Sequence, residues 1–392
     1  MGKKLAITGN QALAEAMRQI NPDVCAAYPI TPSTEIMQRF ASFVSDGVVD
    51  TELVTVESEH SAMSACIGAS AAGGRVMTAT SSQGLALMWE MLHIASGMRL
   101  PIAMTLVNRA LSAPINIHGD HSDGMGSRDC GWIQLYSENA QEAYDNIFQA
   151  VRIAEHEDIR LPAMVCMDGF IISHSIESME FLPDEVIRDF IGEFEPRHPL
   201  LNVEKPVTYG PLVLPDFYIE FKRAQHEAIN KAKKVTLEVA REFEKISGRS
   251  YGLFEPYRLE DADIAVVLLN SAAGTAKDVV DACRDKGIRV GLLKPRLFRP
   301  FPYEEIAEAL GNAKVICVFD RADSFGGFGP MYMEIASAMM ASGSSPLMVN
   351  KIYGLGGRDF MPEDAEAVIS EMTEILNTGK TGALKEYIGV RE

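Results

Sequence analysis

Residues 28–35 read Tyr-Pro-Ile-Thr-Pro-Ser-Thr-Glu; they follow the apolar run 24–27 and lead into a helical pattern. Pro29 and Pro32 flank Thr31, which fixes the φ angle at two positions and removes two backbone donors. Because residues before proline favour extended geometry, this stretch predicts a stiff loop between a strand and a helix. In open α/β sheets, ligands bind at such loops. The Thr31 hydroxyl is therefore a candidate for holding a small ligand.

The alternation of apolar runs and helical patterns continues on both sides of that loop, as far as about residue 175. Candidate strands lie at 24–28, 53–56, 76–80, 102–107 and 163–167, and candidate helices at 11–20, 35–44, 61–72, 86–97 and 140–155. Strict alternation of strand and helix predicts a doubly wound parallel sheet covered on both faces. The helix at 61–72 is made almost entirely of small, uncharged residues, so we expect it to be packed on every side.

A proline-rich stretch and a second α/β unit follow. Five prolines between residues 195 and 215 indicate a linker or wrapping arm. A long polar helix with little apolar face is expected after it, at 217–246, and further strands at 264–269, 289–293, 315–319 and 347–349. The expected organisation is an α/β domain at 1–194, the arm and long helix at 195–255, and a second α/β domain at 256–392.

Composition and charge narrow the class of protein. At about 150 residues per domain, 392 residues predict two or three domains. No run of eighteen apolar residues is present, so no membrane span is expected. The net charge of −18 argues against nucleic acid and anionic membranes as partners. The start of the chain has no apolar signal region, and the six cysteines are scattered, mostly within apolar runs, which favours a cytoplasmic protein with reduced thiols.

Several cofactor motifs are missing from the chain. There is no Cys-x-x-Cys, so neither an iron–sulfur cluster nor a zinc knuckle is expected on it. The glycine clusters at 326–329 and 354–357 do not form Gly-x-Gly-x-x-Gly between a strand and a helix, so a dinucleotide site is poorly supported.

Two polar groups follow predicted strands of the first domain. Glu59 opens the small-residue helix, where the helix dipole stabilises a carboxylate. A plain capping role is one interpretation; the other is that desolvation makes this acid chemically useful. Residues 78–84 end the next strand in hydroxyls and a glycine, which indicates either helix capping or a functional turn.

Arg109 and the loop after it are further candidates. An arginine that leaves an apolar strand presents a planar fork to a carboxylate, although a structural salt bridge is equally open. Residues 118–123, His-Gly-Asp-His-Ser-Asp, hold ligand types that suit zinc or non-haem iron, or they form a hydrogen-bonded active-site loop. The polar residues Asp168, Ser173 and His174 are a similar but weaker cluster.

Taken together, these residues resemble the pyruvate:ferredoxin oxidoreductases, in particular the alpha subunit of the multi-subunit form. The resemblance covers essentially the whole chain, and it extends to Leu293-Lys-Pro-Arg-Leu-Phe-Arg-Pro-Phe-Pro302 in the second unit. It implies a thiamine-diphosphate-binding domain of the pyrimidine type, followed by an α/β domain like the C-terminal domain of transketolase.

The resemblance also implies roles for individual residues. Glu59 would hydrogen-bond N1′ of the aminopyrimidine ring and so activate the cofactor. Thr31 and Arg109 would hold the carboxylate and carbonyl of pyruvate. The residues that would line the cofactor pocket are Ser82, Gln83 and Gly84.

The implied reaction is the reversible oxidative decarboxylation of pyruvate with coenzyme A to acetyl-CoA and carbon dioxide, with electrons passing to ferredoxin. Mg²⁺ and the 4Fe–4S clusters would lie on partner subunits: a beta subunit that completes the thiamine diphosphate site, and gamma- and delta-type subunits. Alone, the chain is expected to be inactive. Three alternatives stay open: a relative acting on another 2-oxo acid, a non-catalytic scaffold subunit, and a nicotinamide dehydrogenase, which rests on the α/β alternation alone.

Overall fold

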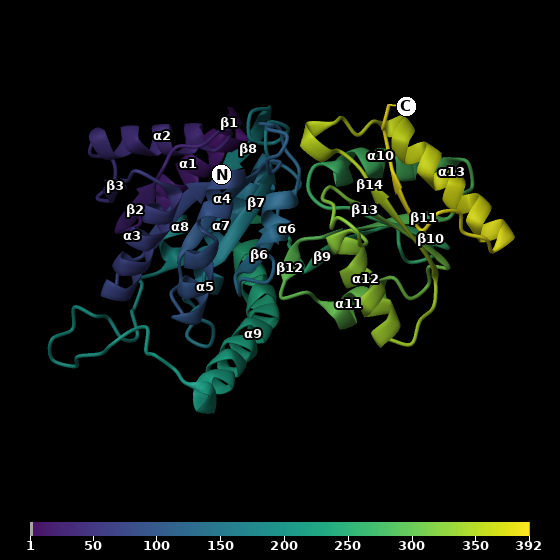
Figure 1. Ribbon diagram of the computed structural model, residues 1–392. Coiled ribbons are helices and arrows are strands. Elements are labelled where there is room, and N and C mark those ends of the chain that lie inside the picture. Colours follow the sequence, from purple (N-terminus) through teal and green to yellow (C-terminus); the bar gives the residue numbers. More distant parts are fainter. Residues whose placement is uncertain (1–2, 392) are drawn as a thin grey trace.

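A computed structural model describes residues 3–391, which form two α/β units that lie side by side (Figure 1). Each unit is built around its own main sheet, and the N-terminus and C-terminus belong to different units. Within the described range, none of the helices has the length and apolar character needed to cross a membrane.

The first unit contains a seven-stranded sheet in the order β12-β6-β7-β5-β4-β2-β3. All neighbours pair in parallel except β12 and β6, which are antiparallel. The strands are β2 (Val24–Ala27), β3 (Glu52–Thr55), β4 (Val76–Thr80), β5 (Ala103–Asn108), β6 (Ile133–Tyr136), β7 (Ala163–Asp168) and β12 (Leu297–Arg299). A separate antiparallel pair joins β1 (Lys3–Thr8) and β8 (Ile176–Phe181).

Helices cover both faces of this sheet, as the alternating pattern predicts. One apolar core lies beneath α1 (Gly9–Ile20), α2 (Thr34–Ser45), α7 (Ala140–Glu155), α8 (Asp184–Ile191) and part of α9 (Pro215–Ser247). A second core lies beneath α3 (Glu59–Ala72), α4 (Ser82–Leu87), α5 (Trp89–Gly97) and α6 (Ser122–Gly126). The predicted doubly wound α/β class is therefore confirmed.

The second unit has a six-stranded sheet in the order β15-β14-β13-β10-β11-β9. Its strands are β9 (Phe254–Tyr257), β10 (Ile264–Val267), β11 (Val290–Pro295), β13 (Val315–Asp320), β14 (Leu347–Ile352) and β15 (Lys385–Tyr387). One face is covered by α10 (Ala272–Asp285) and α13 (Pro362–Thr378), and the other by α11 (Tyr303–Ala309) and α12 (Pro330–Ala341). A short 3₁₀ turn, η1 (Leu355–Gly357), follows β14.

The segment from Leu293 to Pro302 fastens the two units together. After β11 the chain enters the first sheet as β12, although the preceding and following elements belong to the second unit. Buried Arg296 donates from Nη2 to Gln149 Oε1 of α7 at 2.8 Å, and Lys294 pairs with Glu142 of the same helix at 3.0 Å. Buried charges of this kind need partners, and Gln149 and Glu142 come from the first unit, although Lys294 also pairs with Glu255 of β9 in the second unit, at 2.9 Å. This motif is therefore a structural junction.

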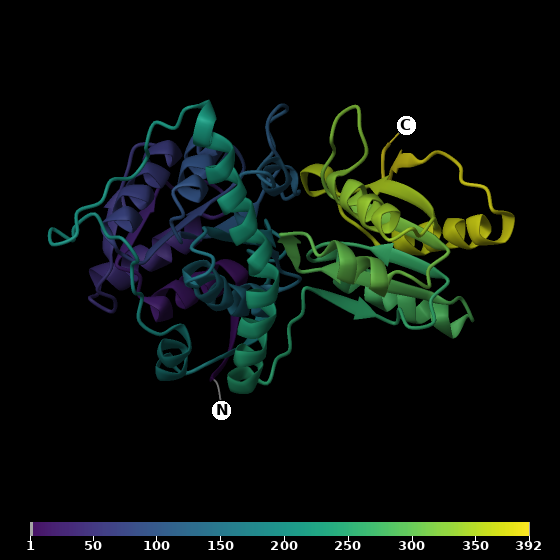
Figure 2. The same cartoon turned by 90° about the horizontal axis from the view of Figure 1, so that it is seen from below.

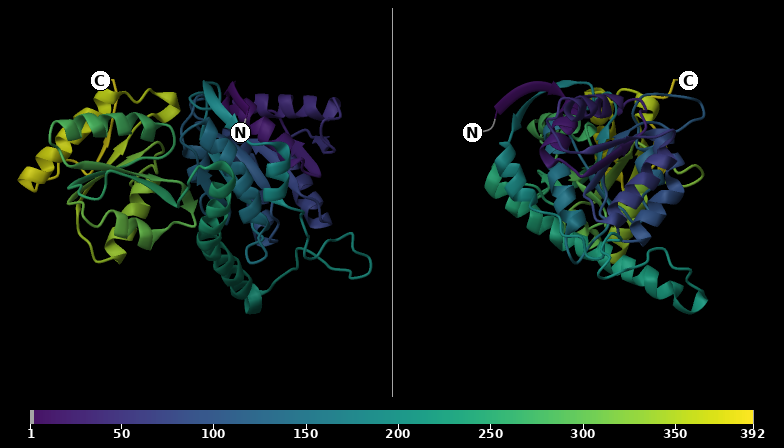
Figure 3. Two further views of the ribbon diagram at one scale, coloured as in Figure 1. Left: turned by 180° about the vertical axis from the view of Figure 1, so that it is seen from behind. Right: turned by 90° about the vertical axis from the view of Figure 1, so that its left-hand side faces the viewer.

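The long helix α9 departs from its prediction in one respect. Its bounds, Pro215–Ser247, agree closely with the predicted 217–246. However, from Ala228 onward it has a clear apolar face, which packs on the first unit at Ala228, Ala232, Val235, Val239 and Phe243. Its first turns project away from the body of the first unit (Figures 1, 2 and 3).

Two further predictions about helices were wrong. The small-residue helix α3 is not packed on every side: Ala62, Met63 and Cys66 are buried, whereas Gly68 is exposed. Small residues let a neighbouring element approach the helix closely, but they do not ensure that such an element covers every side of it. The helix predicted at 86–97 is two helices, α4 and α5, with the break at Met88.

Candidate functional site

Glu59, Thr80 and Gly84 meet at the carboxyl ends of β3 and β4. Glu59 is the first residue of α3 and is only 7% exposed. The N-cap residue of this helix, Ser58, accepts a hydrogen bond from the Ser61 backbone amide. A Cβ atom at Gly84 would lie 2.8 Å from Glu59 Oε1, and closer still to Thr80 Oγ1. The missing side chain at Gly84 therefore makes room for the Glu59 carboxylate.

The side-chain polar atoms of Glu59 and Thr80 have no hydrogen-bond partner in the described part of the chain. The hydroxyl oxygens of Thr80 and Ser81 are buried and make no hydrogen bond there. Among the hydrogen bonds and ion pairs between residues 3 and 391, none involves the Glu59 carboxylate. A buried polar group without a hydrogen-bond partner costs roughly 1–3 kcal/mol of folding free energy. Several such groups close together therefore indicate a binding site for a polar ligand.

Arg109 and Thr31 meet beside this group. Arg109 follows β5 and is only 6% exposed; burial lowers the pKa of its guanidinium from the usual value. It donates from Nη1 to the Thr31 carbonyl and from Nε to the Asn116 carbonyl, each at 2.9 Å. No carboxylate lies within ion-pair distance of Arg109 in the described chain, so the salt-bridge interpretation is not supported. Three of its five N–H groups remain to bind an anion.

Asp123 ties the ends of β4 and β5 together. Its buried carboxylate accepts hydrogen bonds from the backbone amides of Ser82, at 2.9 Å, and Arg109, at 3.0 Å, and from the Asn108 side chain at 2.9 Å. Burial raises the pKa of Asp123 to about 6, against the effect of these donors. Asp123 thus fixes the backbone of Ser82 relative to the backbone of Arg109.

The turn from Ser82 to Gly84 also contacts the loop that follows Arg109. Ser82 Oγ donates to the Ala110 carbonyl at 2.5 Å, and Gln83 Nε2 donates to Ser112 Oγ at 2.7 Å. The predicted site residues therefore form two neighbouring groups, Glu59 with Gly84 and Thr31 with Arg109, and this turn connects them.

The His- and Asp-rich loop is a hydrogen-bonded structure that docks on the second unit. His121 Nε2 lies 2.8 Å from Asp168 Oδ1, and Asp168 also pairs with Arg321 of the second unit at 3.2 Å. Burial alone would raise the pKa of Asp168, but Arg321 and His121 hold it well below its usual range. Asp120 accepts a hydrogen bond from the Gly356 amide at 3.0 Å. Between residues 3 and 391 no three His, Cys, Asp or Glu side chains are grouped to hold a metal ion.

Sequence reasoning missed two of these roles. Asp123 was one of several polar residues in a dense loop, and nothing in its spacing marked it as the group that joins two strand ends. The pair of His121 and Asp168 was missed as well, because its members are 47 residues apart and each is unremarkable alone. Only the position of Asp168 at the end of a predicted strand was a usable signal.

The fold and the site define a ligand-binding α/β protein whose unpartnered polar groups gather at the carboxyl ends of parallel strands. Residues 15–241 match the family described as pyruvate flavodoxin/ferredoxin oxidoreductase, thiamine diphosphate-binding. Residues 262–365 match the pyruvate:ferredoxin oxidoreductase core domain II. The chain belongs to the pyruvate flavodoxin/ferredoxin oxidoreductase family, and residues 15–241 are its thiamine-diphosphate-binding part.

Similar proteins cover nearly the whole chain. A pyruvate synthase subunit PorA from Thermotoga maritima is 54% identical over 390 residues, 100% of this chain and 99% of that protein. The corresponding subunit from Methanocaldococcus jannaschii is 49% identical, over 93% and 94%. A ketoisovalerate oxidoreductase subunit VorA from Pyrococcus abyssi is 44% identical, over 96% and 95%.

A solved structure has the same fold. It is a 2-oxoglutarate:ferredoxin oxidoreductase from Magnetococcus marinus with 2-oxoglutarate, coenzyme A and succinyl-CoA bound, and it matches with a TM-score of 0.74 and 21% identity. The match covers 95% of this chain but 65% of the other, so the chain spans a little under two thirds of that protein's length.

Proposed function

We propose that this chain is the alpha subunit of a pyruvate:ferredoxin oxidoreductase. The complete enzyme converts pyruvate, coenzyme A and two oxidised ferredoxins to acetyl-CoA, carbon dioxide, a proton and two reduced ferredoxins, and the reaction is reversible. Glu59 carries this assignment: its carboxylate is almost buried, lies against Gly84 and has no partner in the described chain. The 54% identity to a pyruvate synthase subunit over the full chain supports it.

The residues around Gly84 fit one edge of an aminopyrimidine ring. A Cβ atom at this position would fill the space in front of Glu59, and the Thr80 hydroxyl beside it is buried without a partner. A carboxylate and a hydroxyl can pair with the ring nitrogen and amino group of the cofactor. When bound, thiamine diphosphate supplies a nucleophilic carbon and an electron sink. In our proposal Glu59 holds a proton at N1′, and Ser82, Gln83 and Gly84 line the pocket.

Arg109 and Thr31 are proposed to hold the substrate. Two N–H groups of Arg109 are committed to backbone carbonyls, which fixes the plane of the guanidinium and leaves the rest to grip a carboxylate. The Thr31 hydroxyl is exposed and makes no hydrogen bond to a described residue, so it is available for the adjacent carbonyl. A two-point grip of this kind orients the 2-oxo carbon toward the cofactor.

Partner subunits are proposed to supply the rest of the machinery. In this proposal a beta subunit completes the thiamine diphosphate site and carries Mg²⁺, while 4Fe–4S clusters on partner subunits, including gamma- and delta-type subunits, pass electrons to ferredoxin. We propose a cytoplasmic complex.

A related 2-oxo acid is the second candidate substrate. The 44% identity to a ketoisovalerate oxidoreductase subunit favours considering it, and the loop from Arg109 to Asp123 borders the proposed substrate position. A scaffold subunit is less well supported, because a subunit that had lost catalysis would not need to hold Thr31, Glu59 and Arg109 together.

Replacement of Glu59 by Gln tests the proposal in the assembled complex. We expect E59Q to lower turnover by at least about 10²-fold, because an amide cannot hold and release the proton in the same way. The matched control is E57Q: Glu57 is an exposed carboxylate two residues away that accepts a hydrogen bond from Ser61. Size-exclusion chromatography checks that both variants assemble. Wild-type turnover in E59Q would favour the scaffold interpretation.

A further inference from the structure

We propose that the arm surface is a docking site for an acidic, partly apolar segment of a different subunit. The arm surface comprises the arm, residues 195–214, and the first turns of α9, residues 215–225. The proposal rests on the proposed function in one respect, namely that the different subunit belongs to the same enzyme.

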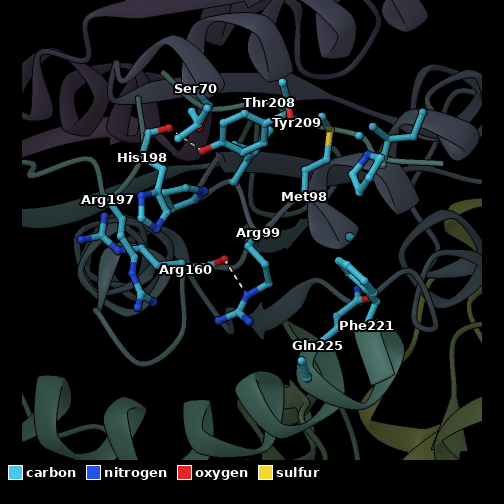
Figure 4. A pocket seen from close by; sticks show the side chains of 18 of the residues that line it. Ser70, Met98, Arg99, Arg160, Arg197, His198, Thr208, Tyr209, Phe221 and Gln225 are labelled. Atoms are coloured by element: carbon cyan, nitrogen blue, oxygen red, sulfur yellow. Dashed lines mark hydrogen bonds between the residues drawn. The ribbon is translucent and has the colours of Figure 1, made fainter. Parts of the chain in front are cut away.

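A cavity of about 980 Å³ lies between the arm surface and the first unit (Figure 4). Its walls come from residues 97–101, which precede β5, from Arg160, which precedes β7, and from the arm surface. It therefore lies at the amino ends of the strands, opposite the edge that holds Glu59 and Arg109. No role in the proposed reaction accounts for it.

The arm surface exposes large apolar side chains, some of which line the cavity and some of which do not. Leu212 is 92% exposed and Val203 is 83% exposed, although both are large apolar side chains. The other exposed large apolar side chains of the arm surface are Leu200, Leu201, Leu214, Phe217, Tyr218, Ile219 and Phe221. Because large apolar side chains exposed in such number mark interaction sites, a protein segment is a better fit than a small molecule held in the cavity alone.

The cavity also gathers cations that have no carboxylate partner. Arg99, Arg160 and Arg197 lie along one side of it (Figure 4). None of the three forms an ion pair with a described Asp or Glu, although the chain carries a net charge of −18. Nε and Nη1 of Arg160 are buried without a hydrogen-bond partner. Burial, together with the nearby charge of Arg197, lowers the pKa of Arg99.

These observations favour a segment that brings its own carboxylates. Unpaired guanidinium groups near a cavity are stabilised when an opposite charge is placed beside them, and apolar side chains of the same segment would cover Leu212 and its neighbours. A second copy of this chain is a poorer occupant. In a two-fold contact each copy presents the same patch, so the cations of one copy would approach those of the other.

The test uses the full chain and its partner subunits, with one charge variant and one apolar variant. Arg197 is exposed and makes no hydrogen bond to a described residue, so R197E is not expected to disturb folding; L212D replaces a side chain that is 92% exposed. We expect each variant to weaken assembly by roughly tenfold or more, measured by titration of the chain against its partners. The effect of R197E should shrink at high salt.

Two controls match these changes. K234E reverses a charge on the exposed side of α9, and M340D places a carboxylate on an exposed apolar position of α12. Both should assemble with wild-type affinity. In the wild-type complex, amide hydrogen exchange at residues 200–221 should be slower than in the chain alone.

Several outcomes would overturn the docking site. Two of them are wild-type assembly by both variants and unchanged hydrogen exchange of the arm in the complex. A loss of self-association only would assign the surface to a second copy of the chain. Full protection of the arm by inorganic phosphate or coenzyme A would assign the cavity to a small anion. Failure of the proposed function looks different: the complex would assemble through the arm but act on no 2-oxo acid.

Discussion

At the scale of single residues, Arg109 shows what a sequence can and cannot predict. Its emergence from an apolar strand, together with the family resemblance, marked it as a candidate. Its contact with the Thr31 carbonyl was not predictable, because 78 residues separate the two and the path of two loops decides the contact. Asp123 was harder still: which of several acidic residues in one loop turns toward β4 and β5 depends on backbone geometry that the sequence does not display.

Replacement of Arg109 by Lys should selectively weaken binding of the 2-oxo acid. Lysine keeps the positive charge but loses the planar fork that contacts two backbone carbonyls and that we propose also binds the substrate carboxylate. With charge-assisted hydrogen bonds worth roughly 1.5–3 kcal/mol, we expect KM for pyruvate to rise about 10- to 100-fold in R109K. R39K, at an exposed arginine of α2, is the control and should leave KM unchanged. An unchanged KM in R109K would remove Arg109 from the substrate site.

At the scale of elements, the strands inside the two main sheets were predicted except β6, and among the edge strands of the described chain only β3 was predicted. Strands β4, β5 and β7 were predicted within one residue at each end because they are mostly apolar and buried along their whole length. Six strands were missed: β1, β6, β8, β9, β12 and β15. Strand β12 has only three residues and exists because it pairs with β6 across the junction of the two units, which is a tertiary effect.

The turn that opens α4 should not tolerate a side chain at Gly84. The methyl group of G84A would meet Thr80 Oγ1 and would lie 2.8 Å from Glu59 Oε1, so the carboxylate must move. A displacement of about 1 Å can cost 10²-fold in rate, and we expect a loss of at least about tenfold in kcat/KM together with weaker thiamine diphosphate binding.

The control for this change is G68A on the exposed side of α3. A Cβ atom there meets nothing within 4 Å, and alanine favours a helix by about 1 kcal/mol over glycine. Unfolding temperature and steady-state kinetics should therefore separate the two variants: G68A is expected to be active and at least as stable as wild type. Full activity in G84A would show that the Glu59 carboxylate is not held where we infer.

At the scale of the whole molecule, the two-unit α/β architecture was predictable and the way the units join was not. The expected boundaries at residues 194 and 255 stay a prediction, because the junction includes β12 and the docked loop as well as the linking helix. We expect both the unpartnered polar groups at the carboxyl edge and the exposed arm surface at the opposite edge in a chain that other subunits complete.

Anaerobic reduction of a viologen dye by the complex that co-purifies with this chain, compared with the isolated chain, tests the proposed function most directly. We predict that the complex reduces dye only when pyruvate and coenzyme A are both present, and that the isolated chain reduces none. Reduction with a different 2-oxo acid would keep the chemistry and change the substrate. Turnover by the isolated chain, or no reduction with any 2-oxo acid by a complex that contains iron and thiamine diphosphate, would contradict the proposed function.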